Sequence, residues 1–161
     1  MGWASAPYDP FWQHRYPKRA GWMSLAGPAA NFSLMLLAAL LIHIGIWTGV
    51  FEAPDSVTFH SFVAAAQPGA WEGAAKLVSI FFSLNLMLGV FNLLPIPPLD
   101  GFSALALFVS EERAHKLEEL RASMGAFSFM LLLGGWKLFD VIYDPLITIA
   151  LRLLYPHLRY S

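Results

Sequence analysis

The sequence predicts an all-α fold: a polytopic membrane protein with about three to four transmembrane helices, one of them broken at Pro95–Gly101. Three observations lead to this prediction. Hydrophobic residues make up 57% of the 161 residues and charged residues only 13%, about half the charged share of an ordinary soluble domain. The mean hydropathy is +0.55. Apolar runs long enough to cross a bilayer alternate with short polar segments.

The composition also excludes several kinds of site and partner. The chain contains no cysteine, which rules out disulfides, thiolate zinc sites and cysteine nucleophiles. Its formal net charge is −1, and no basic stripe is available to neutralise phosphates, so nucleic acid is not expected as a partner. Residues 1–21 lack the apolar core of a signal peptide.

We expect residues 1–161 to form a single membrane domain. The second apolar run stops at Pro95, and the short run after the prolines cannot span a bilayer alone. Together they predict a broken element, which a membrane tolerates only where the freed backbone is buried in protein or lines a cavity. The expected order is a cytoplasmic segment at 1–22, a span at 23–47, an outer loop at 48–73, a broken transmembrane element at 74–109, a cytoplasmic helix at 110–123, and C-terminal transmembrane or interfacial helices at 124–154, interrupted at Asp144-Pro145.

The distribution of positive charge predicts the orientation. Arg15, Lys18 and Arg19 precede the first span, whereas residues 48–75 contain no lysine or arginine. The positive-inside rule therefore places the N-terminal segment in the cytoplasm and the loop outside. The broken element then brings Asp100 toward the cytoplasmic side. We expect an integral protein of a bacterial-type plasma membrane, with the lipid bilayer as a partner.

The broken element is the most informative stretch, because Asp100 follows Pro95, Pro97 and Pro98 within it. Prolines prevent an uninterrupted helix. A carboxylate at the end of an apolar run is costly unless a metal, a cation or a water-filled cavity compensates it. We therefore predict a functional site at the break. Capping of the next helix and a simple Asp-Gly turn are the structural alternatives.

Other polar residues of the spans extend this prediction. Asn85 and Asn92 lie two turns apart on one helical face, with Gly89 between them, and they can converge with Asp100 on one cavity. The alternative is that these asparagines join helices through hydrogen bonds. Asn31, on the first span, can present its amide to a neighbouring helix or to an extended peptide, and packing alone explains that motif equally well.

The histidines do not predict a site. No two of them have the i,i+4 spacing that places two imidazoles on one helical face for zinc. His43 stands alone on the first span, where a packed or hydrogen-bonded histidine is a simpler interpretation than a metal ligand.

Taken in order, these motifs resemble those of the site-2 protease family of intramembrane zinc metalloproteases, in its compact form without an inserted PDZ domain. The resemblance covers nearly the whole chain. Its most specific part is Asn92-Leu93-Leu94-Pro95-Ile96-Pro97-Pro98-Leu99-Asp100-Gly101, which matches the family's Asn-x-x-Pro-x-x-x-Leu-Asp-Gly signature at every defined position. Three further stretches follow the family's order: Gly2-Trp3-Ala4, Pro17-Lys18-Arg19 and Leu25-Ala26-Gly27-Pro28-Ala29-Ala30-Asn31.

The resemblance implies a mechanism and roles for individual residues. In the family, two histidines of a His-Glu-x-x-His helix and the aspartate of the Leu-Asp-Gly motif hold zinc, so Asp100 is expected as the third ligand. Zinc lowers the pKa of a bound water, and the glutamate acts as general base in the attack on a peptide bond. Asn92 and Asn31 are expected to bind the unwound backbone of a transmembrane protein substrate.

The chain departs from the family because it contains no His-Glu-x-x-His. In compact members that helix precedes the Gly-Trp-Ala segment. We therefore expect no catalytic residue in this chain, and neither tight zinc binding nor cleavage by it alone. A fragment or a misplaced start codon is the simplest explanation. The alternative is a non-catalytic, protease-like membrane module that binds transmembrane helices. A third interpretation, part of a transporter, ranks last, because no second broken segment is visible in the sequence. The sequence does not predict the oligomeric state.

Overall fold

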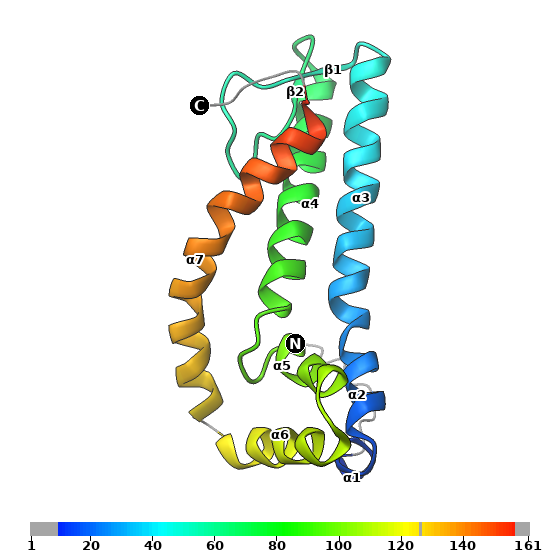
Figure 1. Cartoon of the computed structure of the whole chain (residues 1–161). Helices are drawn as coiled ribbons and strands as arrows, with labels where there is room; N and C mark the ends of the chain where they lie inside the picture. Colours follow the sequence, from blue (N-terminus) through cyan, green and yellow to red (C-terminus); the bar gives the residue numbers. More distant parts are fainter. Residues whose placement is uncertain (1–9, 126, 157–161) are drawn as a thin grey trace, which may run out of the picture. The chain divides into compact units, whose positions relative to one another are not determined.

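The structure is a computed structural model that describes residues 10–125 and 127–156 (Figure 1). Helices dominate it, as predicted. The elements follow in the order α1 (Pro10–Arg15), α2 (Pro17–Ser24), α3 (Ala26–Trp47), β1 (Phe51–Glu52), β2 (Ala64–Ala65), α4 (Ala70–Asn92), α5 (Asp100–Ala104), the 3-10 helix η1 (Leu105–Phe108), α6 (Glu111–Met124) and α7 (Phe127–Leu154).

Contacts divide the chain into two compact units, each described by itself. The first unit combines Met1–Ala26 with Asn92–Gly135, and the second combines Gly27–Phe91 with Trp136–Ser161. Each unit joins segments that are far apart in the sequence. Tertiary packing, and not only local helix formation, therefore holds each of them together.

Two helices of the described residues have the length and apolar composition needed to cross a membrane. They are Pro17–Trp47, which joins α2 to α3, and α4 at Ala70–Asn92. At 1.5 Å per residue α4 is about 35 Å long, which exceeds a hydrocarbon core of about 30 Å. The prediction of three to four such helices is not confirmed, since only these two were found in the part of the chain that the structure describes.

Large apolar side chains project outward from both of these helices. On α3, Leu36 is 61% exposed and Leu40 is 54% exposed, and on α4, Leu77 is 69% exposed. Monomeric soluble proteins rarely present contiguous apolar surface of this kind to water. These helices are therefore suited to an apolar environment.

The C-terminal region differs from the prediction of two helices. Residues 127–154 form the single helix α7, with Pro145 inside it. A proline in a helix interior costs about 3 kcal/mol, because a hydrogen bond is lost and the ring meets the preceding turn. Beyond the proline, Ala150, Leu151 and Leu154 are buried in the core of the second unit. Burying the two leucines contributes up to about 3 kcal/mol each, so packing offsets the cost of the proline.

The predicted outer loop contains a short antiparallel ladder, so the fold is not purely helical. β1 and β2 pair with Phe51 opposite Ala65. Gly45, in the last turns of α3, makes room for this ladder, because a Cβ there would overlap the Phe51 ring. Gly49 follows α3 with φ of 73°, a left-handed turn that favours glycine. Both glycines thus have steric reasons to be where they are.

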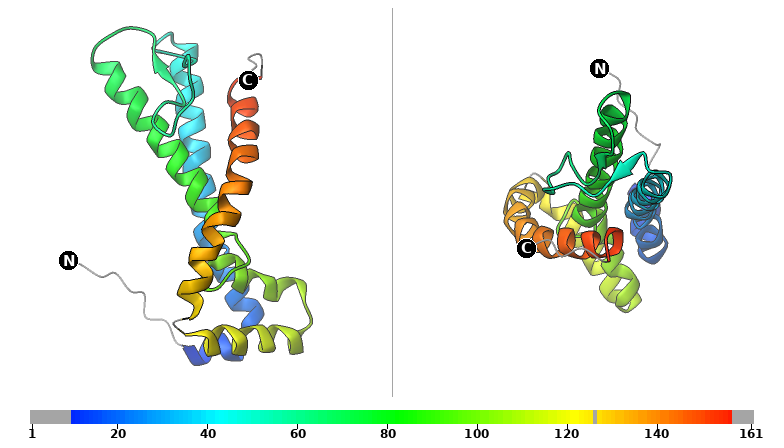
Figure 2. Two further views of the ribbon diagram at one scale, coloured as in Figure 1. Left: turned by 90° about the vertical axis from the view of Figure 1, so that its left-hand side faces the viewer. Right: turned by 90° about the horizontal axis from the view of Figure 1, so that it is seen from above.

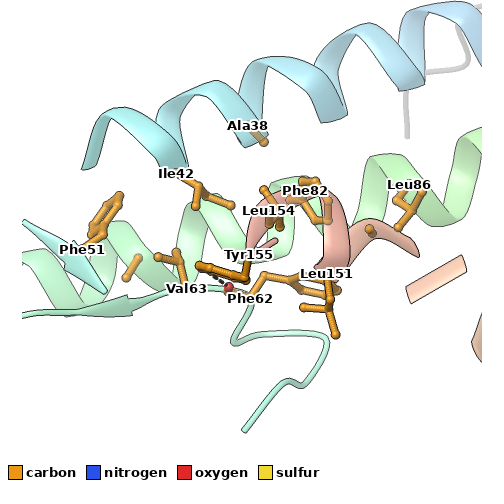
Figure 3. Close-up of a cluster of buried hydrophobic side chains, with 12 residues drawn as sticks. Ala38, Ile42, Phe51, Phe62, Val63, Phe82, Leu86, Leu151, Leu154 and Tyr155 are labelled. Atoms are coloured by element: carbon orange, nitrogen blue, oxygen red, sulfur yellow. Dashed lines mark hydrogen bonds between the residues drawn. The ribbon is translucent and has the colours of Figure 1, made fainter. Parts of the chain in front are cut away.

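Figure 3 shows the core of the second unit, where this loop meets α3, α4 and the end of α7. The rings of Phe62 and Phe82 lie 4.9 Å apart, within the range of favourable aromatic contacts. The Tyr155 hydroxyl donates a hydrogen bond of 2.8 Å to the Phe62 carbonyl oxygen. The end of α7 is thereby tied to the loop by a polar contact inside an apolar cluster.

Ser79 fastens the same loop to α4. Its buried Oγ accepts hydrogen bonds from the backbone N–H groups of Phe62 at 3.0 Å and Val63 at 3.1 Å. Replacing Ser79 with alanine leaves both donors without an acceptor, so we expect a loss of about 2 kcal/mol in stability. Hydrogen–deuterium exchange in detergent micelles should show faster exchange over residues 59–66.

Ser33→Ala is the matched control for Ser79→Ala. The Ser33 hydroxyl is exposed, and among the described residues it bonds only to the Ala29 carbonyl oxygen of its own helix, at 2.8 Å. We expect no change in loop exchange and only a few tenths of a kcal/mol in stability. Equal exchange rates in Ser79→Ala and the parent chain would show that Ser79 does not anchor the loop.

The first unit is organised around α2 (Figure 2). Pro17 begins this helix, at the position where a missing N–H costs nothing. α2 packs on α5 and η1, and a Cβ at Gly21 would lie 3.0 Å from the Ser103 carbonyl oxygen and 3.1 Å from Leu107 Cγ. α6 contacts both α1 and α2. These contacts surround the segment that begins at Asp100.

Candidate functional site

The predicted break lies between α4 and α5, at residues 93–99. The three prolines of this segment have no N–H, and two turn hydrogen bonds organise the rest. Ile96 donates to the Leu94 carbonyl oxygen at 2.8 Å, and Leu99 donates to the Ile96 carbonyl oxygen at 2.9 Å. The Pro97-Pro98 peptide bond is cis. The break is therefore an ordered turn that starts two residues earlier than predicted and ends before Asp100.

Gly101 lets α5 lie directly on the backbone of this turn. A Cβ at this buried position would overlap the Leu93 carbonyl group and would lie 2.6 Å from the Leu94 carbonyl oxygen. No side-chain rotation can relieve such a contact, because the obstacle is backbone. Glycine is therefore required here for packing, and this packing fixes the start of α5.

Asp100 is the first residue of α5 and is half-buried. The N-cap position belongs to Leu99, so Asp100 does not cap the helix as the structural alternative proposed. Within the described part of the chain, no group forms a hydrogen bond or ion pair with its carboxylate. A carboxylate at a helix N-terminus has a modest favourable interaction with the helix dipole. The carboxylate oxygens of Asp100 are otherwise available to bind a ligand.

A polar cavity of about 230 Å³ lies beside Asp100 within the first unit. Its walls come from α1, α2, α5 and α6. Most of the lining side chains are polar: Gln13, Ser24, Asp100, Ser103 and Arg121, with Ala20 and Met23 completing the wall. The space is large enough for several water molecules, so Asp100 faces a cavity of the kind that a charged group next to apolar helices requires.

A partly buried hydrogen-bond network between α1 and α6 forms one side of this cavity. Gln13, only 2% exposed, donates from Nε2 to Glu118 Oε2 at 2.8 Å. Arg121 donates to Gln13 Oε1 at 2.5 Å and, through Nε and a terminal nitrogen, to Glu118 Oε1 at 3.1 and 2.9 Å. This network could not be predicted from the sequence, because Gln13 and Glu118 are 105 positions apart. The i,i+3 spacing of Glu118 and Arg121 was its only sequence signal.

Replacing Gln13 with leucine tests whether this network holds α1 on α6. The substitution keeps the side-chain volume but removes one hydrogen-bond donor to Glu118 and one acceptor for Arg121. Hydrogen bonds to charged groups contribute about 1.5–3 kcal/mol each. We expect the midpoint of thermal unfolding in detergent to fall by several degrees. Glu112→Gln, which breaks the exposed Lys116–Glu112 pair of 2.6 Å, should leave it unchanged.

The two predicted substrate-binding asparagines occupy different units. Asn92 is the last residue of α4 and is half-buried, and its side chain does not line the cavity beside Asp100. Asn31 lies on α3 in the second unit and is also half-buried. Their roles as substrate-binding residues, and their convergence with Asp100, stay predictions.

Asn85 and Gly89 have local roles in the second unit. Asn85 is 4% exposed, and its Nδ2 donates to the Phe81 carbonyl oxygen of its own helix at 2.8 Å. A Cβ at Gly89 would lie 3.0 Å from the ring of Phe32. Gly89 thus allows a close contact between α3 and α4, as expected for a small residue on this face. The group that approaches it is the aromatic ring of Phe32, whereas the expected neighbour was a helix backbone.

Two histidines that are distant in sequence come together in the first unit. The rings of His14 on α1 and His115 on α6 have centroids 6.1 Å apart and an interplanar angle of 86°. The sequence prediction considered histidine spacing along one helix, which cannot detect a contact between two helices.

The described residues fit a zinc site in part. An aspartate oxygen is an ordinary zinc ligand, and the Asp100 carboxylate is without a protein partner among these residues. The same residues contain no group of three or more histidine, aspartate or glutamate side chains placed to hold a metal. The role of Asp100 as a zinc ligand stays a prediction.

Comparison with known proteins gives two matches. Residues 5–134 match peptidase family M50. A curated relative named "Putative zinc metalloprotease YwhC", from Bacillus subtilis (strain 168), is 29% identical over 150 residues. The alignment covers 81% of this chain and 62% of the relative, so the chain spans about three fifths of the length of that protein. No solved structure matches the chain.

Proposed function

Because the chain belongs to peptidase family M50, the site-2 protease family, we propose that it is the part of an intramembrane zinc metalloprotease that supplies the aspartate ligand. The enzyme hydrolyses peptide bonds in or near the transmembrane segments of other proteins. The observation that carries the proposal is the Asp100 carboxylate, which begins α5 beside a polar cavity and has no partner among the described residues.

The chain supplies one zinc ligand in this proposal, Asp100. Two histidines and a glutamate of a His-Glu-x-x-His motif are not in this sequence and come from residues outside it. When bound, zinc provides the Lewis acidity that activates water for attack on a peptide carbonyl. Gly101 holds α5 on the turn and thereby positions Asp100. The network of Gln13, Glu118 and Arg121 keeps the adjacent cavity polar.

The break gives the substrate backbone a place to bind. A transmembrane substrate must unwind before its peptide bond can be attacked, and its freed N–H and C=O groups then need partners. Asn92 adjoins the break and Asn31 lies on α3, and we assign both side-chain amides to this role. Each offers two donors and one acceptor to an extended peptide.

Membrane insertion is part of the proposal. It is supported by the family, by two helices of sufficient length, and by their outward-facing apolar side chains. The proposed location is a bacterial-type plasma membrane. The N-terminal segment faces the cytoplasm and the 48–73 loop lies outside, because lysine and arginine precede the first span and are absent from the loop.

The second candidate is a non-catalytic membrane module that binds transmembrane helices without cutting them. It is favoured by the same absence of His-Glu-x-x-His from the sequence. The two candidates share the break and the asparagines and differ in zinc and in cleavage.

The distinguishing experiment compares this chain with a form extended by the codons that precede it in its genome. Each is purified in detergent and assayed for bound zinc and for cleavage of a reconstituted transmembrane reporter peptide. We expect the extended form to bind one zinc ion and to cleave, with cleavage stopped by a zinc chelator. An extended form that lacks a His-Glu-x-x-His motif would support the module instead, provided that it binds the reporter peptide without binding zinc.

A further inference from the structure

Three cations gather at the junction of α1 and α2 without an acidic partner among the residues that the structure describes. Arg15 ends α1, and Lys18 and Arg19 lie in the first turn of α2; together they are called the basic patch. The sequence contains no acidic residue from Pro10 to Phe51. Within the described ranges, none of the three side chains forms an ion pair with a carboxylate. Their charge is therefore left for another anion to compensate.

A single aromatic ring holds two members of the basic patch. The ring of Tyr16 lies 5.5 Å from Cζ of Arg15 and 5.0 Å from Cζ of Arg19. Two like charges held close to one ring repel each other, whereas a guanidinium over an aromatic face is attracted by the ring. Tyr16 thus offsets part of the repulsion and keeps two exposed guanidinium groups at one place.

The basic patch adjoins the start of a candidate membrane span. Trp22 is 70% exposed and Met23 is 49% exposed, and the apolar helix α3 begins at Ala26. Tryptophan together with arginine and lysine at the end of an apolar helix is typical of the membrane–water interface. The anion that reaches this position is most simply a component of the membrane surface.

We propose that the basic patch binds the phosphate group of an anionic phospholipid such as phosphatidylglycerol. Arginine forks match phosphate oxygens with two parallel hydrogen bonds, and lysine adds a mobile point charge. The acyl chains of the same lipid stay in the bilayer beside the exposed Trp22. This inference rests on the membrane insertion in the proposed function, and it is independent of zinc and of proteolysis.

Helix α6 supplies a matched control for the basic patch. It also carries exposed cations, Arg113 and Lys116, but Lys116 pairs with Glu112 at 2.6 Å, and three further glutamates lie on the same helix. These acids neutralise α6 locally. Removing its cations should not change phospholipid preference.

The experiment measures binding of phosphatidylglycerol and of phosphatidylcholine to the full chain in detergent micelles by native mass spectrometry. We expect the chain to bind phosphatidylglycerol about a hundred-fold more tightly than phosphatidylcholine. A cation near an anionic lipid contributes about five-fold in affinity, so the Arg15→Gln, Lys18→Gln, Arg19→Gln triple variant should lose about a hundred-fold. Its affinity for phosphatidylcholine should not change. The Arg113→Gln, Lys116→Gln control should keep the preference.

Three further measurements make the result decisive. Circular dichroism reports whether the triple variant is folded. If the variant is not folded, the parent chain still tests the proposal, because high salt should reduce its preference for phosphatidylglycerol. Soluble glycerophosphoglycerol carries the same phosphodiester without acyl chains and should bind at least about a hundred-fold more weakly than the lipid. Equal binding would assign the site to free phosphate and overturn the proposal.

An unchanged phosphatidylglycerol affinity in a folded triple variant, or a salt-insensitive preference in the parent chain, would also overturn it. Alkaline carbonate extraction separates this failure from failure of the proposed function. A chain that stays in the membrane pellet but shows no lipid preference contradicts the phospholipid site alone. A chain that is released from the pellet contradicts membrane insertion and the phospholipid site together.

Discussion

Replacing Asp100 with alanine should abolish zinc-dependent peptide cleavage in the form of the chain that carries a His-Glu-x-x-His helix. Loss of a hydrogen-bond partner behind a metal ligand already reduces metal affinity by 10- to 100-fold, so loss of the ligand itself should reduce zinc affinity by at least about a hundred-fold. Competition with a chromogenic zinc chelator measures that affinity. Cleavage of the reporter peptide, measured with excess zinc, tests whether activity follows the metal.

The chain without that helix provides a stability test of the same substitution. The Asp100 carboxylate has no partner among the described residues, and its interaction with the α5 dipole contributes at most about 1 kcal/mol. Asp100→Ala should therefore change the unfolding midpoint only slightly. Glu119→Ala, at an exposed carboxylate on α6, controls for loss of charge. Unchanged proteolysis in Asp100→Ala would remove Asp100 from the zinc site, and a large loss of stability would make its role structural.

The existence of the break could be predicted from sequence, but its boundaries could not. Three prolines within four residues exclude a continuous helix, whatever the tertiary structure. The start of α5 depends on Leu99, whose φ of −70° and ψ of 156° make it the N-cap without a capping side chain. Sequence rules look for serine, threonine, aspartate or asparagine at that position. They therefore assigned Asp100 to the break or to a cap, whereas it is the first residue of the helix.

The polar wall of the cavity could not be predicted, because it depends on contacts between distant segments. Gln13 lies in a short N-terminal helix without apolar periodicity, and only the docking of α1 on α6 buries it against Glu118 and Arg121. The continuous α7 was mispredicted for a similar reason. Pro145 predicts a boundary locally, and the burial of Leu151 and Leu154 in the core overrides it.

Gly101→Ala is expected to have the largest effect on the structure of the site. Alanine in a helix gains up to about 1 kcal/mol over glycine. The added methyl group, however, overlaps the Leu93 carbonyl and lies 2.6 Å from the Leu94 carbonyl oxygen. Overpacking costs about 1–3 kcal/mol and more where the obstacle is backbone. With the overpacking cost at the upper end of that range, we expect net destabilisation of about 2 kcal/mol, seen as a lower unfolding midpoint.

Gly73→Ala is the control that separates helix propensity from packing. Gly73 lies inside α4, and a Cβ there would meet nothing within 4 Å. This substitution should stabilise the chain by up to about 1 kcal/mol, opposite in sign to Gly101→Ala. The two signs follow from one difference, the presence or absence of a backbone obstacle. Stabilisation by both substitutions would mean that α5 does not rest on the turn, and the turn would then not position Asp100.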